Sequence, residues 1–279
     1  MADHSKMKLP PQEAQTASWG PRKLPPQEAQ TASWGPRKLG RKAIKTDSRT
    51  LAFGDYLTPA LPPPPPSADW TQGIANWGMM MNDTLGDCTI AGVGHAIQVW
   101  TANTGSMVTV PDPNIESYYE QWDGYVPGNP GTDNGGVELD VLNDWQKNGF
   151  AGHALMAFAD PKPASLVEIQ QSIALFGGVY IGLALPLTAQ SQEVWDVAPR
   201  GGAKAKPGSW GGHCVYVPKY DANGFTCITW GQQKTMTLAF WKKYCDEAHT
   251  LFGQDWLSAK GAPSGFDQAQ LQSDLSAIK

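Results

Sequence analysis

The segment Asn82-Asp-Thr-Leu-Gly-Asp-Cys88-Thr-Ile-Ala-Gly-Val-Gly-His-Ala-Ile-Gln-Val-Trp100 places a cysteine directly before a run of residues with a helical pattern. Asp87 can cap a helix that reaches about Ala102, and the apolar residues cover too wide an arc for a surface helix, so we expect a central, mostly buried one. A helix N-terminus stabilises a thiolate through its unpaired N–H groups and its dipole, which favours Cys88 as a nucleophile. The alternative is a buried structural thiol, because free cysteine is among the most buried residue types.

A cysteine nucleophile needs a base that lies near it in space. Of the five histidines, one lies in the N-terminal tail and another, His95, lies two turns along the same helix, roughly 10 Å from the sulfur. His213 follows the small residues of Trp210-Gly-Gly212, which leave its ring unobstructed, and is our candidate partner. A strand histidine bonded to the backbone is the alternative. The sequence around His153 and His249 does not separate exposed from structural roles.

Further helices and strands are expected on either side of the middle of the chain. The helices lie at 115–122, 137–147 and 165–176, the last opened by the capping box Ser165-Leu-Val-Glu168. The strands are the buried run 179–185 and a hairpin of 213–217 and 225–230 around Asn223-Gly224. Helices in the first half and antiparallel strands in the second predict an α+β domain.

Charge and composition divide the chain into three parts. Residues 1–50 carry ten Lys/Arg against four Asp/Glu, whereas the rest carries eleven against twenty-two. The first part contains a peptide, Lys8–Arg22, that recurs unchanged as Lys23–Arg37. We expect a disordered basic arm over 1–50, either a solvated tail or a docking peptide for a protein partner. A proline-rich linker should occupy 51–66, with the folded domain at 67–279.

Several classes of protein are disfavoured by composition. The acidic body does not indicate a nucleic-acid-binding domain. No run of eighteen apolar residues predicts a membrane span, and no secretory signal is visible at the N-terminus. The four cysteines lack the spacing of a zinc site, so we expect free thiols in a reducing, cytoplasmic setting, with no metal or cofactor.

Six short motifs occur in one order between about residues 67 and 231. Together they resemble the papain-like cysteine peptidase superfamily, and the Asp-Cys pair at the nucleophile is also similar to bacterial proteins related to its bacteriocin-processing group. The motifs are Asp69-Trp70, Asn82-x5-Cys88, Asn134-Gly135-Gly136, Gly178-Val-Tyr-Ile, Gly212-His213-Cys-Val-Tyr-Val and Thr229-Trp230-Gly231.

The resemblance implies a papain-like fold, in which a helical half carrying the nucleophile helix packs on an antiparallel β half, with a cleft between them. It implies that Cys88 and His213 are catalytic and that Asn82 helps to hold the oxyanion. Gly135 and Gly136 would line the substrate cleft, although a turn before a helix is as good a reading of them. Trp230 would lie beside the histidine, shielding it from water or contacting substrate.

Two positions depart from the family pattern. Asn82 replaces a glutamine and is one methylene shorter, so it can donate to an oxyanion only if the backbone lies closer. The residue that orients the histidine is absent: Ile228 occupies its place, and the hydroxyl of the adjacent Thr229 could accept from His213. Loss of the orienting group should weaken catalysis without abolishing it.

Two functions therefore stand at this point. The first is a cysteine hydrolase that cleaves a peptide or isopeptide amide in a peptide or protein substrate. The second is a catalytically inactive papain-like module for binding or assembly, with the repeated peptide as a docking arm. The first requires Cys88 and His213 to meet across a groove, and it fails if the two groups point into separate regions or are both sealed from solvent.

Overall fold

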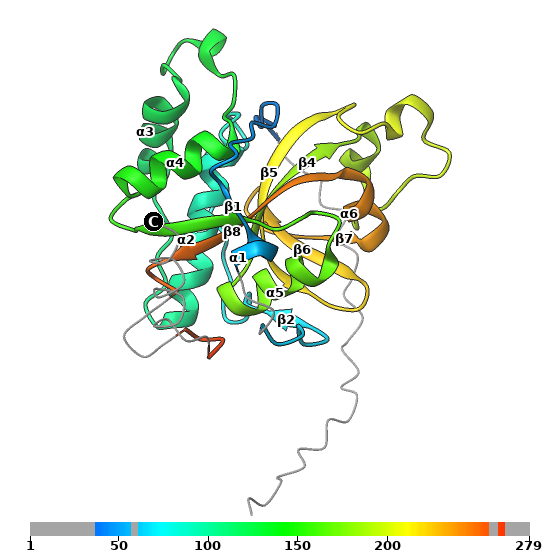
Figure 1. Ribbon diagram of the computed structural model, residues 1–279. Coiled ribbons are helices and arrows are strands. Elements are labelled where there is room, and N and C mark those ends of the chain that lie inside the picture. The colour runs from blue at the N-terminus through cyan, green and yellow to red at the C-terminus, as the bar shows by residue number, and fades with distance from the viewer. Residues whose placement is uncertain (1–36, 57–60, 257–261, 266–279) are drawn as a thin grey trace, which may run out of the picture. The chain divides into compact units, whose positions relative to one another are not determined.

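The structure is a computed structural model that describes residues 37–56, 61–256 and 262–265 (Figure 1). Almost all of the duplicated peptide, up to residue 36, lies outside these residues. In the part described, no helix is both long and apolar enough to cross a membrane. The last part of the predicted arm, 37–50, lies against the body, with a backbone hydrogen bond from Lys42 to Gly136, for example.

The helices follow the sequence pattern closely. All four that the sequence predicts are present within a few residues of the expected bounds, as α2 to α5, and two short ones were not predicted, α1 and α6. The bounds are α1 Phe53–Tyr56, α2 Cys88–Thr104, α3 Asp112–Asp123, α4 Glu138–Asn148, α5 Leu166–Phe176 and α6 Leu238–Tyr244, with short 3-10 turns at Pro130–Thr132, Leu187–Ser191 and Gly202–Ala205.

Helix α2 is the central helix that its apolar arc predicts. Every residue from Cys88 to Thr101 is buried, and the helix ends at Gly105, whose φ of 117° allows the left-handed C-cap. It packs against α3 and α4 on one side and against strand β5 on the other (Figure 1). The first residue of this helix is therefore held at the junction between the helices and the sheet.

In the described residues, eight strands form one sheet, which is mostly antiparallel. Its order is β1-β3-β8-β4-β5-β6-β7, with β2 paired to β5, and β1 pairs with β3 in parallel. The expected hairpin is β5 and β6, joined at Asn223-Gly224. The bounds are β1 Leu51–Ala52, β2 Ala68–Asp69, β3 Leu155–Asp160, β4 Val179–Leu185, β5 Gly211–Tyr220, β6 Gly224–Thr229, β7 Gln232–Thr237 and β8 Cys245–Gly253.

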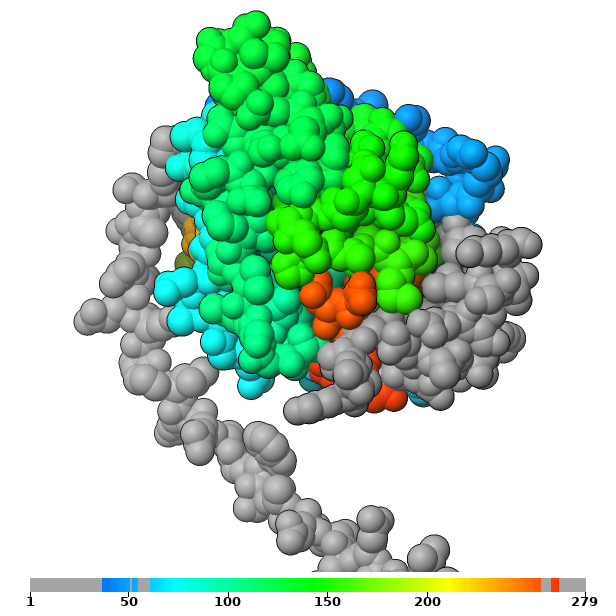
Figure 2. All heavy atoms as spheres, turned by 90° about the vertical axis from the view of Figure 1, so that its left-hand side faces the viewer, coloured from blue at the N-terminus to red at the C-terminus, as the bar shows by residue number. Residues whose placement is uncertain are grey.

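Two hydrophobic cores hold the helical and the β half. The first surrounds α2, α3 and α4 and includes Trp100 and Trp145, whose rings stack 5.8 Å apart. The second lies on the sheet under α5 and α6 and includes Val215 and Trp241. Seen from the helical side, the segment from α2 to α4 forms most of the face (Figure 2). The predicted α+β class is confirmed, and β5 lies where the two halves meet.

Candidate active site

Cys88 contacts strand β5 at this junction, at the residue that follows His213. The sulfur of Cys88 accepts a hydrogen bond from the backbone N–H of Cys214 at 3.3 Å, so it lies against strand β5 beside His213. Both side chains are fully buried. Folding therefore brings the sulfur of Cys88 to the backbone of the residue that follows His213, although the two segments are far apart in the chain.

The imidazole of His213 is held on two sides. Its Nε2 lies 2.7 Å from the hydroxyl of Thr229, and its ring stacks on Trp230 at 4.5 Å with an angle of 11° between the planes. Thr229 thus contacts the imidazole through its hydroxyl, while the neighbouring Ile228 is buried in the sheet. Within the described residues, the other ring nitrogen, Nδ1, is buried without a hydrogen-bond partner.

Burial sets the protonation of both groups. It raises the pKa of the Cys88 thiol to about 12, although the backbone N–H groups of Cys214 and Gly40 oppose the shift. It lowers the pKa of His213 to about 3, and the positive charges of Arg41 and Arg37 add to the effect. The pair is a neutral thiol and a neutral imidazole here. The sequence predicted a thiolate, and burial outweighs the helix terminus on which that expectation was based.

The Asn82 side chain points back to its own loop. Its amide donates to the backbone oxygen of Leu85 at 3.2 Å and to Asp87 Oδ1 at 3.1 Å, and the residue is buried. Burial raises the pKa of Asp87 well above its usual value, against the opposing hydrogen bond from Asn82. In this state the Asn82 amide stabilises the loop before α2. To donate to an oxyanion, it would have to break its hydrogen bond to Leu85 or to Asp87.

A segment from the N-terminal side covers the sulfur. We call residues 37–42 the strap. A Cβ built on Gly40 would lie 1.6 Å from the carbonyl oxygen of Gly86, two residues before Cys88, so only glycine fits there. The strap thus contributes to the burial of Cys88. Residues outside the predicted domain 67–279 therefore help to exclude solvent from the sulfur.

The strap is held by main-chain hydrogen bonds along its length. The N–H of Lys38 bonds to the oxygen of Asn82 at 3.1 Å and that of Arg41 to the oxygen of Gly212 at 3.1 Å. The indole N–H of Trp230 donates to the oxygen of Lys38 at 3.2 Å. Asn82, Gly212 and Trp230 therefore bind an extended peptide of this same chain, and Gly212 directly precedes His213.

The predicted Gly-Gly segment takes part in this contact. Gly136 donates to the oxygen of Gly40 and accepts from the N–H of Lys42, both at 2.8 Å, in a parallel bridge. Gly135 bonds instead to the hydroxyl of Tyr119, and its absent side chain leaves room for the carbonyl of Gly40, 1.7 Å from a built Cβ. An extended backbone thus pairs with Gly136, and Gly135 permits its approach.

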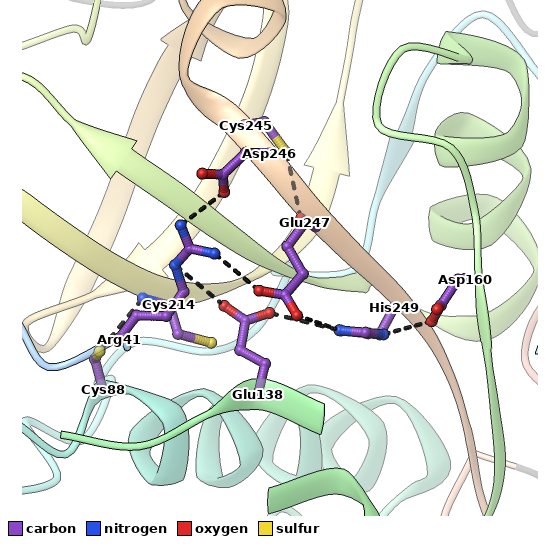
Figure 3. Close-up of polar contacts among 9 residues, drawn as sticks. All are labelled: Arg41, Cys88, Glu138, Asp160, Cys214, Cys245, Asp246, Glu247 and His249. Atoms are coloured by element: carbon purple, nitrogen blue, oxygen red, sulfur yellow. Dashed lines mark hydrogen bonds and ion pairs between the residues drawn. The ribbon is translucent and has the colours of Figure 1, made fainter. Parts of the chain in front are cut away.

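The Arg41 side chain enters a group of three acids, two buried and one exposed, that the sequence did not reveal (Figure 3). Its Nη1 lies 2.8 Å from Glu247, its Nη2 lies 2.7 Å from Asp246, and its Nε lies 3.8 Å from Glu138. We call Glu138, Asp246 and Glu247 the acidic pocket. Despite burial, these three carboxylates raise the pKa of Arg41 above its usual value.

His249 adds a second positive charge to the same group. Its Nδ1 lies 2.6 Å from Asp160 and its Nε2 lies 3.3 Å from Glu247. Burial opposes protonation, but Asp160 and the glutamates prevail and raise its pKa to about 10. Burial likewise raises the pKa of Glu138 to about 8. The side chains of Glu138, Glu247 and His249 are close enough to ligate one cation, but here the guanidinium of Arg41 contacts both glutamates.

This architecture, a buried helix that begins with a cysteine and packs on a strand that carries a histidine, is a papain-like fold. The particular proteins it resembles are cysteine proteases and their precursors. Xylellain, a cysteine protease from Xylella fastidiosa, superimposes with a TM-score of 0.59 at 13% identity, covering 78% of this chain and 96% of its own.

Two proenzymes superimpose as well. Digestive procathepsin L 3 of the Tenebrio molitor larval midgut gives a TM-score of 0.52 at 12% identity, covering 75% of each chain. ProCathepsin B S9 from Trypanosoma congolense gives 0.54 at 10% identity, covering 78% of this chain and 87% of its own. No protein-family model matches the sequence, and no curated protein matches it. At these identities the comparisons establish the fold.

Proposed function

We propose that this protein is a cysteine hydrolase that cleaves a peptide or isopeptide amide, with Cys88 as nucleophile and His213 as acid and base. One observation carries the proposal. The Nε2 atom of His213 contacts the hydroxyl of Thr229, whereas Nδ1 has no hydrogen-bond partner among the described residues. The next residue, Cys214, donates its backbone N–H to the sulfur of Cys88. A base oriented by a third group, with one nitrogen left for the nucleophile, is the pattern that thiol catalysis needs.

The reaction follows from these positions. Nδ1 of His213 takes the thiol proton of Cys88, and the sulfur attacks the carbonyl carbon of the substrate amide. His213 then gives that proton to the departing nitrogen, which leaves an acyl group on the sulfur. Water loses a proton to the same nitrogen, attacks the acyl carbon and releases the acid, and the proton returns to the sulfur. Every proton taken up is given back in the cycle.

The developing oxyanion requires donors near the start of α2. The backbone N–H of Cys88 lies in the first turn, where the helix itself provides no acceptor. The amide of Asn82 is the second candidate, once it releases Leu85 or Asp87. Two such donors aimed at the oxyanion contribute a large part of the rate in acyl transfer.

Gly136 and Trp230 are the proposed substrate contacts. Both already bind main-chain atoms of the strap, through the N–H and C=O of Gly136 and the indole N–H of Trp230. A substrate would use the same groups, so the strap and a substrate exclude one another. Cleavage therefore requires the strap to leave the site.

The experiment is a hydrolysis assay on the full chain with the strap displaced by Gly40→Ala, using a pool of fluorogenic peptides. We expect turnover that Cys88→Ala abolishes and His213→Gln lowers by about a hundredfold or more, since general acid–base catalysis contributes roughly 10²–10⁴-fold. Turnover that persists in Cys88→Ala, or its absence from every chain with a displaced strap, would overturn the proposal.

The second candidate is a papain-like module without catalysis, used for binding. The observation that favours it is the complete burial of Cys88 and His213. The two candidates differ in the reactivity of Cys88. If displacement of the strap leaves Cys88 no faster to alkylate than the other three cysteines, the binding module is the better account.

A further inference from the structure

The acidic pocket is a preformed site in the body of the protein, filled by a side chain of the strap. Glu138 begins α4, and Asp246 and Glu247 belong to β8. On the sheet, Gly182 of β4 pairs with Cys214 on one side and with Glu247 on the other. Residues paired in this way face the same side of the sheet. The pocket therefore begins directly beside the strand that carries His213.

The pocket needs a cation. Glu138 and Glu247 are buried, with exposures of 1% and 6%, and neither carboxylate oxygen of Glu138 has a hydrogen-bond partner in the described residues. Figure 3 shows these carboxylates directed at the guanidinium of Arg41 and at His249. When the strap leaves, His249 is the one cationic side chain among the described residues that still pairs with them. A buried carboxylate without a partner is costly, so a cationic occupant would be favoured.

The geometry selects a guanidinium over an ammonium. Two nitrogens of Arg41 reach two different carboxylates at once, Nη1 to Glu247 and Nη2 to Asp246. A lysine has one terminal nitrogen and cannot reproduce this fork. Gly182 leaves room for the guanidinium: a Cβ there would lie 2.4 Å from Nη1, so the guanidinium would have to shift.

We propose that the acidic pocket is a specificity site for an arginine side chain of the substrate, with Arg41 as its occupant in the covered state. This inference rests on the proposed function, because it names the class of substrate that the same cleft takes. The backbone N–H of Arg41 bonds to Gly212, the neighbour of His213. A substrate arginine in this pocket therefore lies within a few residues of the amide that is cleaved.

Binding to the full chain carrying Gly40→Ala and Cys88→Ala tests the pocket without turnover. The probes are fluorescent hexapeptide amides with arginine at each of the three positions before the scissile amide in turn, and matched peptides with citrulline, which has the same shape but no charge. We expect one position at which arginine binds about tenfold to a hundredfold tighter than citrulline, the range for losing a buried charge partner. Lysine should fall between them.

Two further substitutions test whether the preference for arginine arises in the acidic pocket. Glu247→Gln removes a carboxylate, and Gly182→Ala places a methyl group where the guanidinium lies, so each should abolish the preference for arginine. Glu193→Gln, an exposed glutamate elsewhere, should leave it unchanged. Should Gly40→Ala fail to fold or to release the strap, Arg41→Ala with Cys88→Ala empties the pocket directly and is measured in the same way.

Equal binding of arginine and citrulline at all three positions would overturn the proposal, as would a preference that survives both Glu247→Gln and Gly182→Ala. The two proposals fail separately. A chain with Cys88 intact that binds arginine selectively but never turns over disproves the hydrolase and keeps the pocket. Turnover with no preference for arginine does the reverse.

Discussion

The hydroxyl of Thr229 lies 2.7 Å from Nε2 of His213, at the position next to the one where the family pattern places an asparagine. Ile228, which occupies that position, is buried in the sheet and offers no side-chain acceptor. When the hydroxyl accepts from Nε2–H, the imidazole is the tautomer with Nδ1 unprotonated. We propose that this Thr–His contact takes the place of the usual orienting contact.

Thr229→Val should lower hydrolysis without removing the nucleophile. The valine keeps the shape of the side chain but cannot accept from His213, so the imidazole loses its orientation. With the strap displaced, we expect kcat/KM to fall about ten- to a hundredfold, which is less than the roughly 10²–10⁴-fold that a general base contributes, because the imidazole itself remains. Thr229→Ser, which retains the hydroxyl, should stay within a few-fold of the parent chain; an equal loss in both variants would mean that packing, not the hydrogen bond, is responsible.

Gly40→Ala should expose Cys88 to reagents. The added methyl group meets the backbone oxygen of Gly86, which cannot yield as a side chain would. Once the strap has left, water reaches the sulfur and the charges of Arg37 and Arg41 leave His213, so burial no longer holds the thiol pKa at about 12. We expect alkylation by iodoacetamide at neutral pH to become at least about tenfold faster at Cys88, as for thiols with a lowered pKa.

Mass spectrometry of the labelled peptides measures this change residue by residue. Ala43→Ser, at an exposed position just beyond the strap, is the matched control and should behave like the parent chain. Unchanged labelling of Cys88 in Gly40→Ala would show that the strap does not limit access. Faster labelling of all four cysteines would indicate general loosening instead.

The fold could be predicted from the sequence because its signals are local. The apolar arc of α2, the capping box at Ser165 and the Asn223-Gly224 turn each depend on a few neighbouring residues, and all three elements formed as expected. The acidic pocket has no such signal. Arg41, Glu138 and Glu247 come from three distant segments, and only the folded chain brings them together.

The protonation state of Cys88 could not be predicted from the sequence either. A helix N-terminus predicts a lowered thiol pKa, but the strap and the β half exclude water, and this exclusion dominates at Cys88. The contact of Thr229 with His213 was foreseen as a possibility, since a hydroxyl beside the vacant position can accept. The catalytic roles themselves stay predictions.

His249 should make the folded state less stable at alkaline pH. Its pKa rises from 6.5 to about 10 on folding, because Asp160 and the glutamates outweigh burial. A raised pKa means that the folded state holds the proton more tightly, so the stabilisation is complete below pH 6.5 and is lost as the pH rises to about 10. Denaturant midpoints measured across this window should fall in the parent chain and fall less in His249→Gln. The same slope in both chains would exclude His249 as the cause.

Asn82→Ala distinguishes two roles of the Asn82 amide, which are donating to the oxyanion and stabilising the loop before α2. If the amide holds the oxyanion during the reaction, its loss should lower kcat by about 10²–10³-fold, the usual cost of removing one such donor. Alkylation of Cys88 involves no oxyanion and should then change little in a chain with the strap displaced. If the amide acts only through Leu85 and Asp87, the loop before α2 loosens, and stability, alkylation and hydrolysis all change together. Parallel measurement of the three quantities separates the roles, because only the oxyanion role uncouples hydrolysis from the other two.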